Sequence, residues 1–158
     1  MFEPLKRLIR ARALRKHAST TPTGITPLAA LHSAVVFIDA SDVALDSLKA
    51  AVCLFFDARH ISVRILSPGP KELNWYGRIR RPRKGTPVPP AEELFISLCA
   101  PDSFASTFAA VTSPARFKVG RVQLPGDVYD LVVSDREGVL ESTTAVFDTI
   151  TQLLNKIQ

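Results

Sequence analysis

The residues best suited to chemistry are carboxylates and hydroxyls at the ends of two apolar runs of strand length. They are Asp39, Ser41, Asp42, Asp102 and Ser103. Paired carboxylates can bind Mg²⁺ together with a phosphate ligand, because a hard cation prefers oxygen donors. Asp and Ser are also the usual residues at helix starts. Capping of the helices that follow is therefore the simpler interpretation of the same residues.

A second candidate site is the segment 73–77, Leu-Asn-Trp-Tyr-Gly, which contains the only tryptophan and one of the two tyrosines. Trp75 and Tyr76 can stack on a base or a sugar while the arginines that follow contact phosphates. The alternative is that this segment anchors a long loop to the sheet edge, because buried aromatic rings contribute strongly to packing. If the first group forms a ligand crevice, we expect Asn74, Trp75 or Lys118 to line it.

Patterns for nucleotide, nucleophile and metal chemistry are absent from the sequence. It has no glycine-rich dinucleotide loop, no P-loop and no nucleophile elbow. None of its three histidines has a catalytic partner by local pattern, and its two cysteines lie in apolar segments away from them. Such cysteines do not make a usual zinc site, and as buried free thiols they fit a reducing cytoplasm. We therefore predict no catalytic residue, no metal site and no cofactor.

The net charge of +5 is concentrated in two segments of the 158-residue chain. Residues 1–17 carry six cations and one glutamate, and so do residues 71–84. Each segment therefore sums to +5, and the rest of the chain sums to −5. This partition favours a polyanion or another acidic surface as partner. The residues that we expect to contact it are Lys6, Arg7, Arg10, Arg12, Arg15, Arg78, Arg80, Arg81 and Arg83.

The basic N-terminal segment is predicted to be a weakly amphipathic helix over residues 1–18, followed by a linker over residues 19–27. Its narrow apolar stripe at helical spacing consists of Phe2, Leu5, Leu8 and Ile9. Arginines surround this stripe, and such a helix is marginal without a packing partner.

Residues 28–158 are predicted to form one Rossmann-like, three-layer α/β domain with a mostly parallel five-stranded sheet. The predicted strands are 34–39, 61–66, 93–99, 116–119 and 129–134. Three helices are predicted. The first covers 43–58 and is capped by Ser41 or Asp42, the second is short, ends at 111 and is capped by Asp102 or Ser103, and the third covers 141–157. A long loop rich in proline and arginine covers 67–90. Strand order 2-1-3-4-5 would place the first candidate group in the crevice beyond strands 1 and 3, where such folds bind ligands.

Four segments, 36–42, 72–77, 117–120 and 129–133, resemble a family of short, uncharacterised bacterial proteins with a basic N-terminal helix. The pieces Asn-Trp-Tyr-Gly and Phe-Lys-Val-Gly are its most specific features, and the stretch 79–90 departs from it. The resemblance implies a cytoplasmic protein of Bacteroidetes-type bacteria, but no activity. More distantly, 93–98 and 115–120 are similar to the N-terminal domain of heptosyltransferase-like glycosyltransferases. Those enzymes need a second Rossmann-like domain for the nucleotide sugar, which this chain is expected to lack.

We therefore expect a cytoplasmic, non-enzymatic binding or scaffold module that contacts an acidic partner such as RNA or the ribosome. One alternative is binding of a nucleotide or phosphosugar, or an enzymatic role, at the crevice. Another is a membrane-surface adaptor that uses the basic helix. No apolar run in the sequence is long enough to span a bilayer.

Overall fold

The computed structural model describes residues 3–81, 85, 91–100, 103–135 and 141–157. Its centre is a five-stranded sheet in which every pair of neighbouring strands is parallel. The strands are β1 (Ser33–Phe37), β2 (Ser62–Leu66), β3 (Leu94–Ser97), β4 (Phe117–Gly120) and β5 (Leu131–Val132). They lie in the order β2-β1-β3-β4-β5, so the predicted α/β fold and strand order are confirmed.

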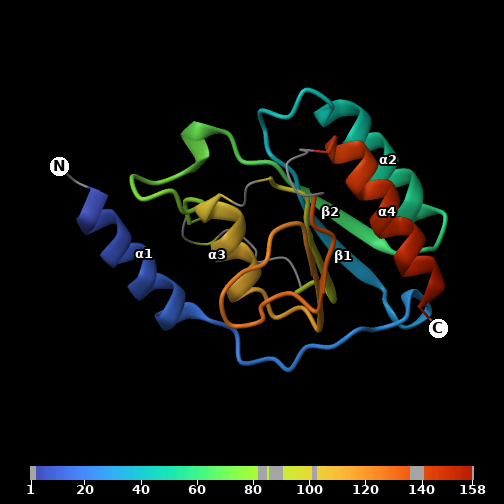
Figure 1. Ribbon diagram of the computed structural model, residues 1–158, viewed down its shortest axis with the longest axis horizontal. Coiled ribbons are helices and arrows are strands. Elements are labelled where there is room, and N and C mark those ends of the chain that lie inside the picture. Colours follow the sequence, from blue (N-terminus) through green and yellow to red (C-terminus); the bar gives the residue numbers. More distant parts are fainter. Residues whose placement is uncertain (1–2, 82–84, 86–90, 101–102, 136–140, 158) are drawn as a thin grey trace.

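Helices cover both faces of this sheet (Figure 1). They are α1 (Glu3–His17), α2 (Leu45–Asp57), α3 (Phe104–Thr112) and α4 (Thr143–Lys156). A short 3-10 turn, η1 (Leu28–Ala30), precedes β1, and another, η2 (Pro70–Glu72), follows β2. The helices α2 and α4 lie together on one face and α3 lies on the other. The N-terminal helix α1 contacts α3 and is separated from α2 and α4 by the rest of the molecule. No described helix is long and apolar enough to cross a membrane.

The core is divided by the sheet into two clusters. On the face of α2 and α4, Val36 of β1 packs with Val52 and Ile150, among others. On the opposite face, Phe37 packs with Phe95 and with residues of α3. Successive side chains of a strand point to opposite faces, so a strand buried on both sides must be apolar throughout. This requirement explains the continuous apolar runs in the sequence.

The linker lies along the body of the domain. The backbone N–H of Ser19 donates to the carbonyl of Val111 at 2.9 Å, and that of Gly24 donates to the carbonyl of Arg116, also at 2.9 Å. The Thr23 hydroxyl donates to Asp130 at 2.9 Å. These bonds hold residues 19–24 against the domain, so that the C-terminal end of α1 has a fixed position.

The last strand is shorter than predicted because its first two residues, Tyr129 and Asp130, make side-chain contacts with β4. The Tyr129 ring covers Gly120 at the end of β4, where a Cβ atom would lie 2.3 Å from the ring. The Asp130 carboxylate accepts the backbone N–H of Lys118 at 2.8 Å, and the Asp130 N–H donates back to the Lys118 carbonyl at 2.8 Å. Only Leu131 and Val132 then pair as β5. The Phe-Lys-Val-Gly segment thus ends in glycine because the tyrosine ring needs the space.

The substitution Gly120→Ala should lower the free energy of unfolding by about 1–3 kcal/mol, the usual cost of overpacking a core. The added methyl group would overlap the Tyr129 ring. Urea denaturation followed by circular dichroism measures the change. Gly24→Ala is the matched control, because a Cβ atom there meets nothing within 4 Å. Equal stability of the two variants would contradict the close approach.

Candidate functional site

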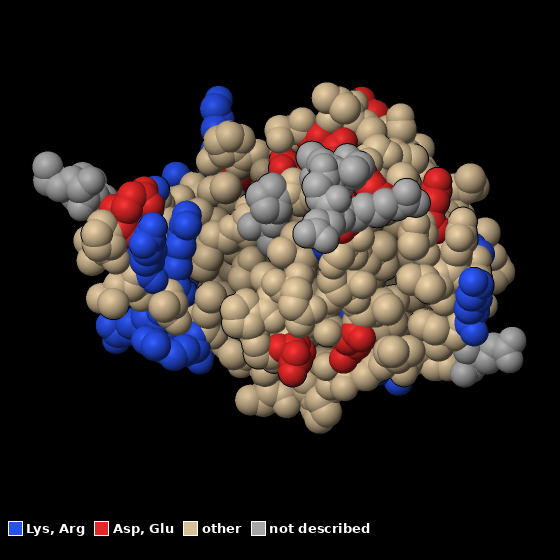
Figure 2. Space-filling model, in the orientation of Figure 1, with Lys and Arg blue, Asp and Glu red and all other residues tan. Residues whose placement is uncertain are grey.

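The two cationic segments meet at one end of the molecule, on the outer side of α3. Arg10 of α1 makes the connection. Its Nε donates to the carbonyl oxygen of Tyr76 at 2.7 Å, and its guanidinium carbon lies 4.9 Å from the centroid of the Phe104 ring. Figure 2 shows Lys and Arg side chains gathered over α1 at this end, with one acidic side chain among them, while other Asp and Glu side chains are scattered over the visible face. We call this end the cationic surface; its described members are Lys6, Arg7, Arg10, Arg12, Arg15, Arg78, Arg80 and Arg81.

A tight turn presents the second cationic segment. Leu73 and Ile79 form an antiparallel bridge, and the Asn74 side chain organises the residues between them. Its Oδ1 accepts the backbone N–H groups of Tyr76 at 3.1 Å and Arg78 at 3.0 Å. Gly77 closes the turn with φ +92°, a conformation that favours glycine. Asn74 and Gly77 of the Asn-Trp-Tyr-Gly segment therefore have structural roles, and Asn74 does not reach the crevice predicted for it.

An aromatic cluster lies beneath the arginines. The Tyr76 ring meets Phe104 at 6.1 Å between centroids, and Phe104 meets Phe108 one helical turn further along α3 at 5.9 Å. Arg78 stacks over Phe108, with its guanidinium carbon 4.3 Å from the ring centroid. His17 at the end of α1 meets the same Phe108 ring edge-on at 6.0 Å. Cation–π contacts of this kind contribute about 0.5–1 kcal/mol at exposed sites.

The packed face of α1 differs in part from the predicted one. Ile9 of the predicted stripe is half-buried, but Leu5 and Leu8 are 49% and 68% exposed, whereas Ala13 is buried and Arg10 is partly buried. Phe2 lies outside the described residues. The reason is that α3 offers aromatic rings, which accept a guanidinium and an imidazole. The two leucines are left on the outer side.

The cations of this surface have few carboxylate partners. In the described part of the chain, one ion pair involves a member of this surface: it joins Lys6 to Glu3 at 3.8 Å, within α1 itself. The positive field shows in two pKa values. Burial raises the pKa of Tyr76, but hydrogen bonding by Arg78 and Asn74 and the positive charge of Arg78 and Arg81 outweigh it, so the pKa lies below its ordinary value.

The pKa of His17 is also lowered. Desolvation is the largest cause, and the positive charges of Arg78, Lys16 and Arg81 lower this pKa further. The imidazole is therefore neutral over a wider pH range than a free histidine, and its contact with Phe108 adds no charge to the surface.

Trp75 stands at the tip of the turn and is 56% exposed. Its ring contacts Tyr76 edge-to-face, with 5.5 Å between centroids and 82° between planes. Leu73 packs against the core and Tyr76 packs on Phe104, so these two residues do anchor the loop as expected. Trp75 is not an anchor, because most of its ring faces outward.

Arg83, predicted to contact the acidic partner, lies outside the described residues.

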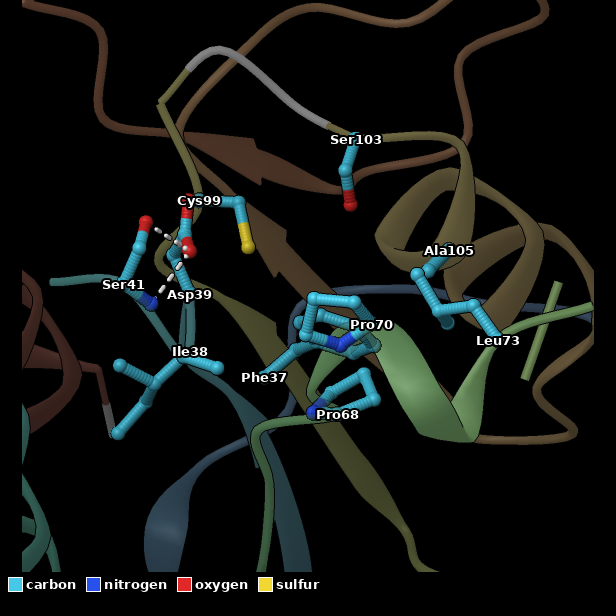
Figure 3. A pocket seen from close by; sticks show the side chains of 11 residues that line it. Phe37, Ile38, Asp39, Ser41, Pro68, Pro70, Leu73, Cys99, Ser103 and Ala105 are labelled. Atoms are coloured by element: carbon cyan, nitrogen blue, oxygen red, sulfur yellow. Dashed lines mark hydrogen bonds between the residues drawn. The ribbon is translucent and has the colours of Figure 1, made fainter. Parts of the chain in front are cut away.

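The predicted crevice exists as a small cavity of about 250 Å³ at the carboxyl ends of β1 and β3 (Figure 3). Of the predicted ligands, the structure brings Asp39, Ser41 and Ser103 together there. Asp39 Oδ1 accepts the backbone N–H of Ser41 at 2.9 Å and its hydroxyl at 2.7 Å. Ser103 caps α3 as predicted, accepting the N–H of Ser106 at 3.2 Å. The remaining lining is Phe37, Ile38, Ala40, Pro68, Pro70, Leu73, Cys99 and Ala105, which is largely apolar.

The other predicted crevice residues lie elsewhere. Asp42 faces a separate hollow, where it accepts the backbone N–H of Ala44 at 2.9 Å and the Thr143 hydroxyl. The helix α2 starts at Leu45 with no side-chain cap, so the prediction that Ser41 or Asp42 caps it is wrong. A turn from Asp39 to Asp42 displaces the helix start beyond their reach. Asp102 lies outside the described residues.

Lys118 is a buried lysine of β4, beside Phe95 of β3. Desolvation lowers its pKa, and the nearby Asp130 carboxylate offsets part of that shift. It does not line the cavity at the ends of β1 and β3, because its position in the strand precedes the carboxyl edge of the sheet.

Arg121 was not predicted to have any role, yet it organises the carboxyl edge of the sheet. Its side chain is only 3% exposed. The guanidinium donates to Asp135 at 3.0 Å, to the Thr143 hydroxyl at 3.1 Å and to the carbonyls of Leu98 and Glu141. These bonds tie the ends of β3 and β4 to the start of α4. A charged residue directly after a strand-ending glycine was the available signal in the sequence.

In comparisons with known proteins, no family model matches the chain, and no curated protein or solved structure matches it. Within the described residues, no three His, Cys, Asp or Glu side chains lie close enough to share a metal ion. The function is therefore inferred from the cationic surface and the cavity themselves.

The substitution Arg10→Ala should loosen α1 from α3. It removes a cation–π contact of about 0.5–1 kcal/mol and a charged hydrogen bond of about 1.5–3 kcal/mol, so the α1 amides should exchange at least tenfold faster. Hydrogen–deuterium exchange measures this directly. Arg12→Ala is the matched control, because Arg12 is exposed on the same helix, whereas Arg10 bonds to Tyr76 and stacks on Phe104. Equal exchange in the two variants would contradict a specific role for Arg10.

Proposed function

We propose that this protein is a non-enzymatic binding module of the bacterial cytoplasm that contacts RNA, free or in the ribosome, through the cationic surface. The observation that carries the proposal is the meeting of α1 and the turn. Two cationic segments far apart in the sequence lie together on α3, joined by the bond from Arg10 to Tyr76. A protein gains nothing in stability by gathering like charges, so their gathering favours an external polyanion.

The way the arginines are held supports RNA as the partner. Arg10 and Arg78 are stacked on aromatic rings of α3, and a stacked guanidinium keeps its N–H donors available for phosphate. Arg12 and Arg15 are exposed on α1. The surface thus combines fixed and mobile cations, and phosphate contacts of both kinds position an RNA backbone.

The cavity at the ends of β1 and β3 is less suited to a nucleotide or a phosphosugar. Its described lining contains no Lys or Arg side chain, and Asp39 places a carboxylate at its mouth. A phosphate group would meet a negative charge there without a compensating cation. Its volume of about 250 Å³ is also smaller than most ligand pockets, which span roughly 300–1,000 Å³.

The double substitution Arg12→Gln and Arg15→Gln should weaken binding of a structured RNA. It should also reduce the slope of log affinity against log salt concentration by about 1.5, since each lost phosphate contact removes roughly 0.7–0.9. Fluorescence anisotropy over a salt series measures both. Lys49→Gln with Lys156→Gln is the matched control, which removes two charges from α2 and α4. Salt-independent binding, or equal losses in both double variants, would contradict the proposal.

A membrane surface is the second candidate, favoured by one observation. Leu5 and Leu8 are exposed on the outer side of α1, with basic residues around them. Such a face can lie in the interface of an anionic bilayer.

The double substitution Leu5→Gln and Leu8→Gln separates the two candidates. It removes apolar area but no charge, so the RNA affinity should stay within about twofold of wild type, because phosphate contacts carry that binding. Co-sedimentation with vesicles containing anionic lipid tests the alternative in the same samples. Tight vesicle binding by wild type that the double variant loses, without RNA binding by either, would favour the membrane.

A further inference from the structure

The turn 74–81 lines an open hollow of about 360 Å³ within the cationic surface. Its lining consists of Asn74, Tyr76, Arg78, Ile79, Arg80 and Arg81. Three guanidinium groups and a tyrosine thus line a single hollow, and no carboxylate is among the described residues around it. Hydrogen bonding by Arg78 and Asn74 and the charges of Arg78 and Arg81 outweigh burial and lower the pKa of Tyr76, as expected beside this cluster of cations.

The arginines of this hollow are placed before any ligand binds. Arg78 is stacked on Phe108, and Arg80 donates from Nε to the Leu73 carbonyl at 3.1 Å, which leaves its terminal nitrogens for a ligand. Arg81 is exposed at the edge. None of the three takes part in an ion pair that the described residues form. Fixed, uncompensated guanidinium groups are well suited to phosphate oxygens, which they bind in a bidentate manner.

Trp75 adds an aromatic face beside these cations. Its ring is 56% exposed although its neighbours Leu73 and Tyr76 are packed. The edge-to-face contact with Tyr76 holds the ring upright at the tip of the turn. An exposed ring next to arginines is the arrangement by which proteins bind single strands, because unpaired bases stack on the ring while the backbone follows the cations. Bases in a duplex are already stacked and cannot use such a ring.

We propose that the turn is a recognition site for single-stranded nucleic acid, in which Trp75 stacks on an unpaired base and Arg78, Arg80 and Arg81 contact the adjoining phosphates. This inference rests on the proposed function and specifies the form of the polyanion. The arginines of α1 then contact the strand further along, because Arg10 holds α1 against the turn. Recognition is tolerant of sequence, since every base has a face that can stack.

The experiment uses the fluorescence of Trp75, the only tryptophan of the chain. The full-length protein is titrated with an oligouridylate of about 12 nucleotides, within the range of known single-strand site sizes. Stacking should quench the emission, and an RNA duplex of the same length should quench it much less. An oligothymidylate strand tests the sugar: equal quenching assigns the site to single strands in general, and weaker quenching assigns it to RNA.

Variants supply the second measurement. Trp75→Ala should weaken oligouridylate binding roughly 5- to 150-fold by anisotropy, the range for loss of one stacked base. Leu54→Ala is the matched control, because Leu54 is an exposed apolar side chain on α2, away from the turn. Circular dichroism verifies that both variants fold, which the exposure of both side chains favours.

The outcomes separate this inference from the proposed function. If RNA binds with salt dependence but the Trp75 emission stays unchanged and Trp75→Ala binds as tightly as wild type, the stacking site is wrong and the RNA-binding module stands. Equal quenching by duplex and single strand overturns the preference for single strands. Absence of RNA binding by anisotropy overturns both.

Discussion

The arrangement of this molecule depends on the guanidinium group of Arg10. It belongs to α1, donates a hydrogen bond of 2.7 Å to the turn at Tyr76 and stacks on Phe104 of α3. One side chain therefore fixes three segments that the sequence places far apart. A short basic helix with two exposed leucines is marginal alone, and Arg10 acts with buried Ala13 and the His17–Phe108 contact to hold α1 on α3. Arg10 is itself one of the cations of this surface. Its contacts with Tyr76 and Phe104 bring the α1 cations and the turn cations together into one surface.

The polar and charged side chains at the two ends of the molecule are used differently. At the carboxyl edge of the sheet, polar side chains hydrogen-bond within the protein. Asp42 accepts the Thr143 hydroxyl, and Arg121 joins the ends of β3 and β4 to α4. At the α3 end, by contrast, arginines are oriented by aromatic rings and backbone carbonyls but not neutralised. The usual ligand position of a parallel α/β fold thus retains only a small, largely apolar cavity, and the proposed binding surface lies on an added helix and loop. A fold by itself does not determine where function resides.

Sequence patterns predicted the sheet well because its strands are buried on both faces. The apolar runs of β1 and β3 indicate strands covered on both faces, and the predicted order β2-β1-β3-β4-β5 is the observed one. The packing of α1 was not predictable, because hydropathy places Arg10 on the solvent side, whereas the aromatic rings of α3 accept it. The last strand was overestimated, since neither the Tyr129 ring over Gly120 nor the Asp130 carboxylate bond is visible in an apolar pattern. The cationic segments themselves were evident from charge, but their meeting is a property of the fold.

Photochemical crosslinking of RNA to the full-length protein, followed by mass spectrometry of the crosslinked peptides, tests the central claim most directly. If the cationic surface is one binding face, crosslinks should fall on both α1 and the turn 74–81, including Trp75 or Tyr76, in the same complex. Their yield should fall together as salt is raised, because phosphate contacts underlie both. Crosslinks confined to α2 and α4, or to α1 with none on the turn at any salt concentration, would contradict the account.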